Sequence, residues 1–514
     1  MAMKTYPVQK FGTKLMVSSL AVNTIPDQYM SYSRNARIKD WGIGPRRGKQ
    51  LLTNSVLGTN NKGAFYMNNK LFQIANSKIY EINTTTGVQT EKATLGYDAT
   101  CDILVYGNSI AIISSSGQDL KLYDGVTTVT TIGTDPASFP TANTGILEYC
   151  RGFSFCAGNN ILYISRPITA ANSEYSYDFT GSGSQNITYD SNIIGLKSTL
   201  NGLYVLTENK VEYLGANALQ NVSWSATFIS TPLGEGSQPI SNLSIVASGD
   251  SITYITKNLQ VQKVSFMNGT NATSIGELSA RPIISIKEFL NTIDTSQPSS
   301  FGFFNQNDKT VQFHIRSVGS PFNDYVLIYD EVNDTWNVDT QKNYNYVVKI
   351  ASKYYGFSDV NSSVYEDDTG YSDAGVPIEF RVDTQNMNQW TPNQKIYGGL
   401  YVMGGIWLLS TVQVIANIDT EPVFQDEISG NPNNIPALGE IGWDAIGEDL
   451  IGGGLTYNPK LFPFDRRADV GRMYHGGKRF QFSFRSNSSE QDFLIDSVWL
   501  YYEPTNFIDI SEVF

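Results

Sequence analysis

One pattern recurs along most of this chain: a turn containing Asn or Gly, four to six alternating apolar residues, a second polar turn and another short strand. The clearest copies are MNNKLFQIANSKIYEINTTTG from residue 67, YGNSIAIISSSGQDLKLYDG from 106, CRGFSFCAGNNILYISRP from 150 and TLNGLYVLTENKVEYLG from 199. Three more copies begin at residues 247, 307 and 351, and successive copies start 39 to 60 residues apart. Such alternation between polar turns predicts β-hairpins, and a repeat of roughly 40 to 50 residues is typical of propeller blades.

Seven such units constrain the fold because a single four-stranded blade exposes both of its faces. A closed ring of blades buries every face and leaves only short edges. The sequence therefore predicts an all-β fold, with a β-propeller of six to seven irregular blades over residues 51–365. A stack of β-sandwiches is the alternative, because short, closely spaced strands also fit that class. Aromatic residues make up 12% of the 514 residues and charged residues only 17%, a balance that favours strands over helices.

Residues 366–514 depart from the repeat and predict an antiparallel β-sandwich-like C-terminal region. Their long apolar stretches lie at 378–382, 395–403 and 410–418, and KRFQFSFRSNSSEQDFLIDSVWLYYEP (478–504) predicts a hairpin of long strands. The Gly-, Asn- and Pro-rich stretch 426–454 predicts an exposed loop or a segment that a partner orders. Residues 1–50 are interpreted as a separate N-terminal anchor segment.

Charge and cysteine content argue against several classes of protein. The net charge of -13 results from 36 basic and 49 acidic residues, without a basic stripe, which argues against a protein that reads or grips nucleic acid. The three cysteines, Cys101, Cys150 and Cys156, are too few and too scattered for a disulfide framework, so we expect folding inside a cell. The apolar run at 15–22 is too short to span a bilayer and lacks a cleavage site, which predicts no signal peptide and no stable membrane insertion.

Residue types suited to catalysis are scarce. The only histidines, His314 and His475, lie in a predicted strand and beside a Gly-Gly pair, so neither a Ser-His-Asp triad nor a multi-histidine metal site is expected. The densest acidic cluster, in YEDDTGYSDAG (365–375), has the residue types to flank a sugar or bind a cation, but acids that precede glycines are more often turn formers. The sequence predicts no enzymatic activity, no cofactor and no metal site.

Motifs near the N-terminus and after the repeats resemble those of a known family. The first stretch, FGTKLMVSSLAVNTIPDQYMSYSRNARIKDWGIGPRRGKQLL (11–52), contains a proline before a polar run, an Asn-x-Arg step at Asn35 and Arg37, and the turn Gly-Pro-Arg-Arg-Gly at 44–48. It is similar to the opening of tail hub or nozzle proteins of short-tailed bacteriophages, including the tail accessory proteins that close the portal channel. The family has an arginine where this chain has Gly44.

The second stretch, VYEDDTGYSDAGVPIEFRVDTQ, is similar to the same family's exit from the propeller. Its Asp-x-Gly-x-Pro-Ile step is formed by Asp373, Gly375, Pro377 and Ile378. The C-terminal stretch that ends IDSVWLYYEP is also similar to the strand pair that closes such proteins. The resemblance follows the order of elements from about residue 10 to 505, with some forty residues in specific motifs.

The resemblance implies a structural virion protein, assembled in the host cytoplasm and located in the tail. Such a subunit forms a homo-oligomeric ring, commonly a hexamer, below the portal and adaptor rings. The ring conducts the genome DNA without sequence-specific binding and anchors tail fibre or needle proteins. An acidic wall would repel DNA phosphates within a Debye length of about 8 Å. Under this hypothesis the interface candidates are Arg46, Arg47, Asp373, Gly375 and Pro377, and loop 426–454 is a candidate contact or channel constriction.

Two other functions stay open at this point. A carbohydrate-binding or glycan-cleaving β-propeller would carry its ligand loops at one end of the channel and would act as a monomer. A scaffold propeller of a cellular complex is the third hypothesis, although the C-terminal region and the N-terminal motif fit it poorly.

Overall fold

The computed structural model divides into two compact units, which we call the propeller unit and the sandwich unit. The propeller unit consists of residues 49–334 and 339–369, and the sandwich unit of residues 1–48, 335–338 and 370–514. Residues 1–48, interpreted above as part of a separate anchor segment, therefore belong to the same unit as the C-terminal region. The structure describes residues 4–7, 30–39, 42–53, 61–126, 129–131, 144–166, 178–179, 184–200, 202–215, 231–232, 237–266, 273–277, 289–296, 300–384, 387, 395–406, 410–419, 421–429, 462–468, 476–477, 479–488 and 492–504.

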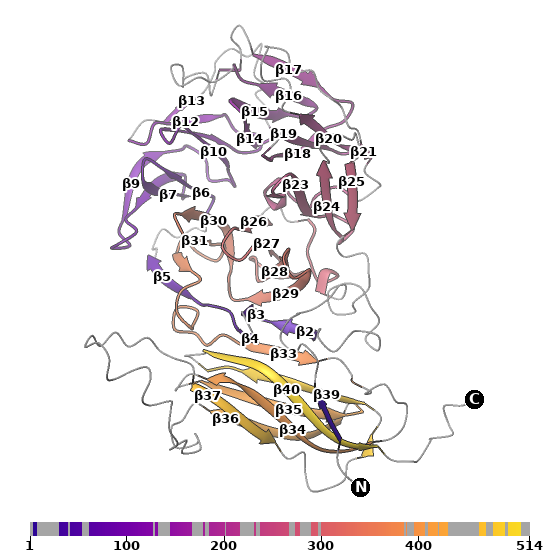
Figure 1. Ribbon diagram of the computed structural model, residues 1–514. Coiled ribbons are helices and arrows are strands. Elements are labelled where there is room, and N and C mark those ends of the chain that lie inside the picture. The colour runs from indigo at the N-terminus through magenta and orange to yellow at the C-terminus, as the bar shows by residue number, and fades with distance from the viewer. Residues whose placement is uncertain are drawn as a thin grey trace, which may run out of the picture. The chain divides into compact units, whose positions relative to one another are not determined.

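The propeller unit is built from antiparallel sheets whose strands follow one another along the chain (Figure 1). The first blade is β6 (Gly63–Met67), β7 (Lys70–Ala75), β8 (Lys78–Ile82) and β9 (Gln89–Thr94). The second is β10 (Asp102–Tyr106), β11 (Ile110–Ser114), β12 (Lys121–Tyr123) and β13 (Val129–Thr131). The third is β14 (Ile146–Cys150), β15 (Phe153–Gly158), β16 (Ile161–Ile164) and β17 (Gln185–Thr188).

The remaining blades continue this order until the last one. The fourth is β18 (Ile193–Ser198), β19 (Gly202–Thr207), β20 (Lys210–Gly215) and β21 (Thr231–Pro232). The fifth is β22 (Val246–Ser248), β23 (Ser251–Ile255), β24 (Val261–Phe266) and β25 (Thr273–Glu277), and the sixth contains β26 (Phe301–Asn305), β27 (Thr310–Ile315) and β28 (Tyr325–Asp330). The seventh is β30 (Tyr344–Ile350), β31 (Lys353–Ser358), β32 (Val364–Asp367) and, from the N-terminal side of the chain, β5 (Lys49–Thr53).

The first strands of the blades close a ring. The strands β6, β10, β14, β18, β22, β26 and β30 each contact the next one, and β30 contacts β6. The described residues thus form a seven-bladed β-propeller, which confirms the predicted fold class. Each of the seven sequence copies supplies the second and third strands of one blade. Closure depends on β5, which pairs antiparallel with β32 and completes the last blade.

Local turn chemistry explains why these segments form hairpins. Asn68 and Asn69 join β6 to β7 with φ values of +53° and +58°, and Asn76 and Ser77 join β7 to β8 with +49° and +59°. Two consecutive residues with positive φ are the requirement of a type I′ turn, which matches the twist of the paired strands. Apolar side chains of adjacent blades then share cores. In one such core Phe72 of the first blade contacts Tyr123 of the second, with ring centroids 5.5 Å apart.

The sandwich unit consists of two sheets packed face to face. The strands of one sheet are β1 (Lys4–Pro7), β3 (Ala36–Lys39), β4 (Gly42–Pro45), β34 (Lys395–Ile406), β37 (Phe462–Ala468), β38 (Gly476–Gly477) and β40 (Phe493–Pro504). The strands of the other are β2 (Met30–Arg34), residues 335–338 of β29 (Thr335–Thr340), β33 (Phe380–Thr384), β35 (Thr411–Ile418), β36 (Glu421–Ser429) and β39 (Phe480–Ser486). A single core cluster contains side chains from both sheets, such as Phe380 and Phe493, whose ring centroids lie 4.9 Å apart. The pairing of β2 with β29 is parallel, through Arg34 and Val338.

Two expectations for the C-terminal region need correction. The stretch 478–504 is not a hairpin, because β39 pairs with β33 and β35 in one sheet while β40 pairs with β34, β1 and β4 in the other. Both strands bury apolar side chains in the same core, so they face each other across it. Residues 426–429, expected to begin an exposed loop, instead continue strand β36. The rest of that loop, 430–454, and His475 lie outside the described residues.

Candidate functional site

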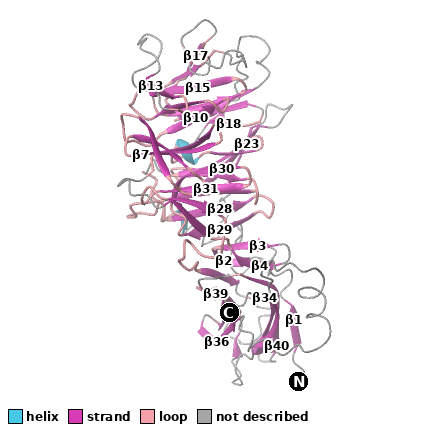
Figure 2. Cartoon of the chain, turned by 90° about the vertical axis from the view of Figure 1, so that its left-hand side faces the viewer, coloured by secondary structure: helices cyan, strands magenta, loops and turns pink. Residues whose placement is uncertain are grey.

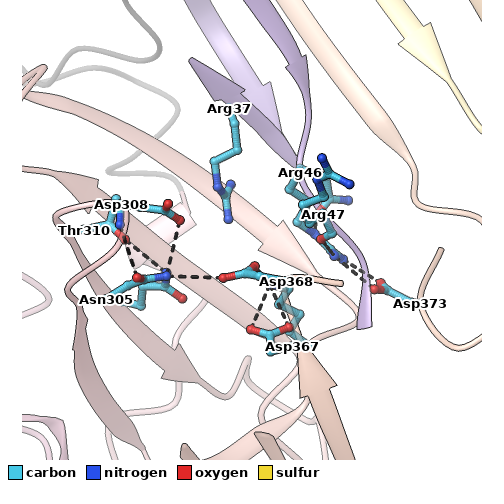
Figure 3. Close-up of polar contacts among 12 residues, drawn as sticks. Arg37, Arg46, Arg47, Asn305, Asp308, Thr310, Asp367, Asp368 and Asp373 are labelled. Carbon is cyan, nitrogen blue, oxygen red and sulfur yellow. Dashed lines mark hydrogen bonds and ion pairs between the residues drawn. The ribbon is translucent and has the colours of Figure 1, made fainter. Parts of the chain in front are cut away.

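The two motif stretches of the sequence meet in the sandwich unit. Arg46 follows β4 directly, and its guanidinium forms two parallel hydrogen bonds with the carboxylate of Asp373, which lies 327 positions later (Figure 3). The distances are 3.0 Å from Nη1 to Oδ1 and 2.6 Å from Nη2 to Oδ2. The side chains are 0% and 2% exposed, so this ion pair is buried inside the chain. We call the residues around it the motif cluster: Asn35, 46–48, 370–373 and 375–379.

Further hydrogen bonds hold the arginine in place. Arg46 Nε donates to Asn35 Oδ1 at 3.0 Å, and the Arg46 backbone N–H donates to the Asn35 carbonyl at 2.9 Å. Asn35 has φ +53°, a left-handed conformation that asparagine tolerates better than most residues, and its Nδ2 donates to the Glu379 carbonyl at 2.8 Å. A buried guanidinium is stable only when paired and hydrogen-bonded, and these contacts meet that need.

The Asp-x-Gly-x-Pro-Ile step forms a tight turn that presents Asp373. Asp373 and Val376 exchange two backbone hydrogen bonds, and Ala374 and Gly375 between them have φ +54° and +89°. These are the positive φ values of a type I′ turn, which explains the glycine. After Pro377, the chain buries Ile378 completely.

Gly48 and Arg47, which follow Arg46 in the sequence, have different roles. Gly48 donates its N–H to the Gly370 carbonyl at 3.1 Å, and a Cβ on Gly48 would lie 2.0 Å from the backbone oxygen of Ser372, so only glycine allows this approach. Arg47 is exposed, and its guanidinium lies 4.8 Å from the ring centroid of Tyr371. This cation–π contact orients Arg47 without burying its charge.

The structure therefore separates the interface candidates. Arg46 and Asp373 serve the interior of the sandwich unit and do not present their charges at its surface. Arg47 and Gly375 are exposed, and Pro377 is half-buried. The surface role that the sequence analysis assigned to all five residues is thus available to Arg47, Gly375 and, in part, Pro377.

The acidic cluster of the sequence is distributed over ion pairs. In the propeller unit, Glu366 pairs with Lys353 at 2.7 Å, while Asp367 and Asp368 both contact the ammonium of Lys342, at 2.9 and 3.0 Å. Asp368 also accepts from Asn305 Nδ2 at 3.3 Å (Figure 3). Among the described residues, no group of three or more His, Cys, Asp or Glu side chains has the geometry to hold a metal ion.

A feature that the sequence analysis missed lies on the axis of the propeller ring. The 3₁₀ helix η3 (Asn242–Ser244) begins with Asn242, whose Nδ2 donates to Asp102 Oδ2 at 2.9 Å and whose Oδ1 accepts from the Leu196 N–H at 3.1 Å. Asp102 Oδ2 also accepts from the Leu147 N–H at 2.9 Å, and burial raises the pKa of Asp102 to about 6. These partners lie at the inner strands β10, β18 and β14.

The same short helix contacts other blades as well. It touches β26, and its Leu243 packs against a cluster that includes Leu71 of the first blade and Tyr346 of the seventh. Contacts with blades on several sides place η3 inside the ring, where it fills the axis. The only sign of this contact in the sequence is Asp102, a carboxylate at the start of the otherwise apolar stretch CDILVY (101–106).

Strands account for nearly all regular structure in the described residues, as Figure 2 shows. Within these residues no helix is long and apolar enough to cross a membrane. The cysteines Cys101, Cys150 and Cys156 are buried and free, and burial raises the pKa of the Cys150 thiol to about 12. A thiol so protonated is a poor nucleophile and metal ligand.

Comparison with known proteins finds no matching family model and no matching curated protein. Similar solved structures include BamB from Moraxella catarrhalis, with 10% identity over 64% of this chain and 92% of that chain and a TM-score of 0.38. The WD40 β-propeller domain of Doa1 has 10% identity over 62% of this chain and 97% of that chain, with a TM-score of 0.38. YCF48 bound to a D1 peptide has 10% identity over 62% and 93%, also with a TM-score of 0.38. The propeller assignment rests on the strand pairing described above and not on these likenesses.

Proposed function

We propose that this chain is a structural tail hub or nozzle subunit of a short-tailed bacteriophage. In this role it forms a ring, commonly a hexamer, below the portal and adaptor, conducts the genome and anchors fibres or a needle. The observation that carries the proposal is the motif cluster. Each stretch that resembles the phage family supplies one half of a buried ion pair, Arg46 with Asp373, and these two residues are 327 positions apart.

The position of the motif cluster along the chain supports a mechanical role. Gly48 is followed directly by β5, the strand that closes the propeller, and Gly370 follows shortly after β32, the strand that β5 pairs with. The hydrogen bond from Gly48 to Gly370 and the Arg46–Asp373 pair join the two chain segments where they leave the propeller sequence. In the proposed role, these contacts hold the two segments together when the subunit bears load during genome ejection.

The filled propeller axis defines the path of the DNA within this proposal. Asn242 and Asp102 hydrogen-bond inside the ring of blades, so a duplex has no route along that axis. We therefore propose that the conduit lies between subunits of the assembled ring. The formal net charge of -13 suits such a conduit because like charge discourages DNA from sticking to its wall.

The acidic cluster does not offer free carboxyl groups to the glycan-cleaving alternative. Glycosidases need a pair of carboxyl groups free to act on the glycosidic bond. Here Glu366, Asp367, Asp368 and Asp373 are each engaged with a lysine or an arginine.

The proposal is tested by the mass of the purified protein in solution, alone and after mixing with portal and adaptor rings from the same source. We expect a hexamer-sized species, or a monomer recruited onto those rings in fixed stoichiometry. The variant Arg47→Glu reverses an exposed charge and should weaken this assembly without lowering the melting temperature. Lys257→Glu, at an exposed propeller position, serves as the matched control. A persistent monomer that ignores the rings and binds glycans would refute the proposal.

A further inference from the structure

Lys342 of the propeller unit belongs to a cluster of charged side chains that has no role in the proposed function. Its side chain is 1% exposed, and its Nζ lies 2.9 and 3.0 Å from the two carboxylate oxygens of Asp367 and 3.0 Å from Oδ1 of Asp368. The Asp367 side chain is 4% exposed and that of Asp368 is 29% exposed. The primary amine thus contacts both a buried carboxyl group and a second, more accessible carboxyl group.

The surroundings of this triad are aromatic and fix its geometry. Tyr344 OH donates to Asp367 Oδ1 at 3.3 Å, and the Tyr344 ring contacts those of His314 and Tyr365, at centroid distances of 5.4 and 6.2 Å. His314 Nδ1 lies 3.1 Å from the Lys342 carbonyl. An amide-forming step needs a neutral amine and a neutral carboxylic acid. Proton transfer along the Nζ–Asp367 hydrogen bond would supply both, and burial makes such a neutral pair less costly than it is in water.

We propose that Lys342 and Asp367 form an intramolecular amide bond, with Asp368 as the proton carrier. The lone pair of neutral Lys342 Nζ attacks Cγ of the protonated Asp367 carboxyl, and the Tyr344 hydroxyl stabilises the oxygen that becomes negative. Asp368 takes a proton from the nitrogen and returns it to the leaving hydroxyl, which departs as water. One N–C bond forms, one C–O bond breaks, and no oxidant or co-reactant is required.

The bond would stabilise the blade that closes the ring. Lys342 and Asp367 are 25 positions apart, where Lys342 precedes β30 and Asp367 is the last residue of β32. Asp367 is also the cross-strand partner of Lys49 in the closing strand β5. A covalent link between these ends reduces the conformational entropy of the unfolded chain, as a disulfide does.

Mass spectrometry of the full chain under denaturing conditions tests the proposal. We expect an intact mass lower than the sequence mass by one water molecule, and a digest in which the peptides of Lys342 and Asp367 stay joined. The variant Lys342→Arg should have the full mass, because a guanidinium does not acylate here. Asp368→Asn, which lacks the proton carrier, should have the full mass or lose water much more slowly.

A matched control excludes the other source of water loss in this chain. Asp124 precedes Gly125, and an Asp-Gly step loses water by forming a succinimide. The variant Asp124→Glu should keep the mass deficit if the deficit arises at Lys342. The full sequence mass in the folded wild-type protein overturns the proposal. A deficit that survives Lys342→Arg, or that disappears in Asp124→Glu, overturns it as well.

Discussion

Arg46 and Asp373 form a buried, bidentate ion pair across 327 positions of sequence, with Nη2 and Oδ2 only 2.6 Å apart. Both side chains are excluded from solvent, so each charge depends on the other for stabilisation. Asn35 completes the arrangement by accepting from Arg46 Nε. The pair joins the segment that leads into the propeller sequence to the segment that leads out of it.

Loss of either partner should therefore destabilise the sandwich unit strongly. We expect Arg46→Met or Asp373→Leu to lower the free energy of unfolding by about 3–5 kcal/mol, because each leaves the other charge buried and unpaired. Arg46→Lys should also be destabilising, since an ammonium does not reproduce the two parallel hydrogen bonds. Denaturant titration of the purified variants measures these differences.

Two controls for this prediction are a double variant of the buried pair and a variant of an exposed ion pair. The double variant Arg46→Met with Asp373→Leu should be less destabilised than either single variant, because no unpaired charge remains. Lys78→Gln breaks an exposed ion pair with Glu91 and should change stability little. Single variants at Arg46 and Asp373 that unfold like the wild-type protein would show that the pair is dispensable.

The repeated hairpins were predictable because each contains its own turn chemistry. Alternation and turn residues such as Asn68 and Asn69 identify the seven copies, and these match the second and third strands of the blades. The closing strand β5 was not predicted, because its partner β32 is about 300 positions away and a local pattern does not specify a distant partner.

The sequence identified residues of the candidate site but did not indicate their surroundings in the fold. The motifs named Arg46 and Asp373, yet nothing in the residue types indicated that the two would meet and be buried. The error about 478–504 has a related origin. Two long apolar strands next to each other in sequence suit a hairpin and a sandwich equally well, and the choice depends on which strands are nearest in the fold.

Asp102 should make stability depend on pH because its carboxyl group is buried in the folded protein. Burial raises its pKa to about 6, so between about pH 4 and pH 6 the folded state binds more protons than the unfolded state. This contribution to stability is therefore present at low pH and is lost as pH rises through 6. The variant Asp102→Asn should lack this pH-dependent contribution. Between pH 4 and pH 6, the free energy of unfolding of the wild-type protein should therefore fall relative to that of the variant, by at most about 3 kcal/mol.

Denaturant titration at several pH values between 4 and 6.5 measures the Asp102 effect. The exposed Asp98, changed to Asn, provides the matched control and should leave the pH dependence of the wild-type protein unchanged. A constant difference between the wild-type protein and Asp102→Asn across the range would contradict the prediction.

His314 should have the opposite effect on the pH dependence of stability. Desolvation lowers its pKa to about 3 in the folded state, whereas an unfolded histidine titrates near 6.5, so the unfolded state takes up a proton first as pH falls. Stability should decrease by about 1.4 kcal/mol per pH unit below pH 6 from this group. The variant His314→Phe fits the aromatic cluster but loses the hydrogen bond to the Lys342 carbonyl, so it should be less stable than the wild-type protein at pH 7.5. Because the variant lacks the pH-dependent slope, this difference in stability should shrink or reverse at pH 4.5. Nuclear magnetic resonance of the ring protons gives an independent test, because the His314 signals should not titrate above pH 4, and a midpoint near 6.5 would rule the mechanism out.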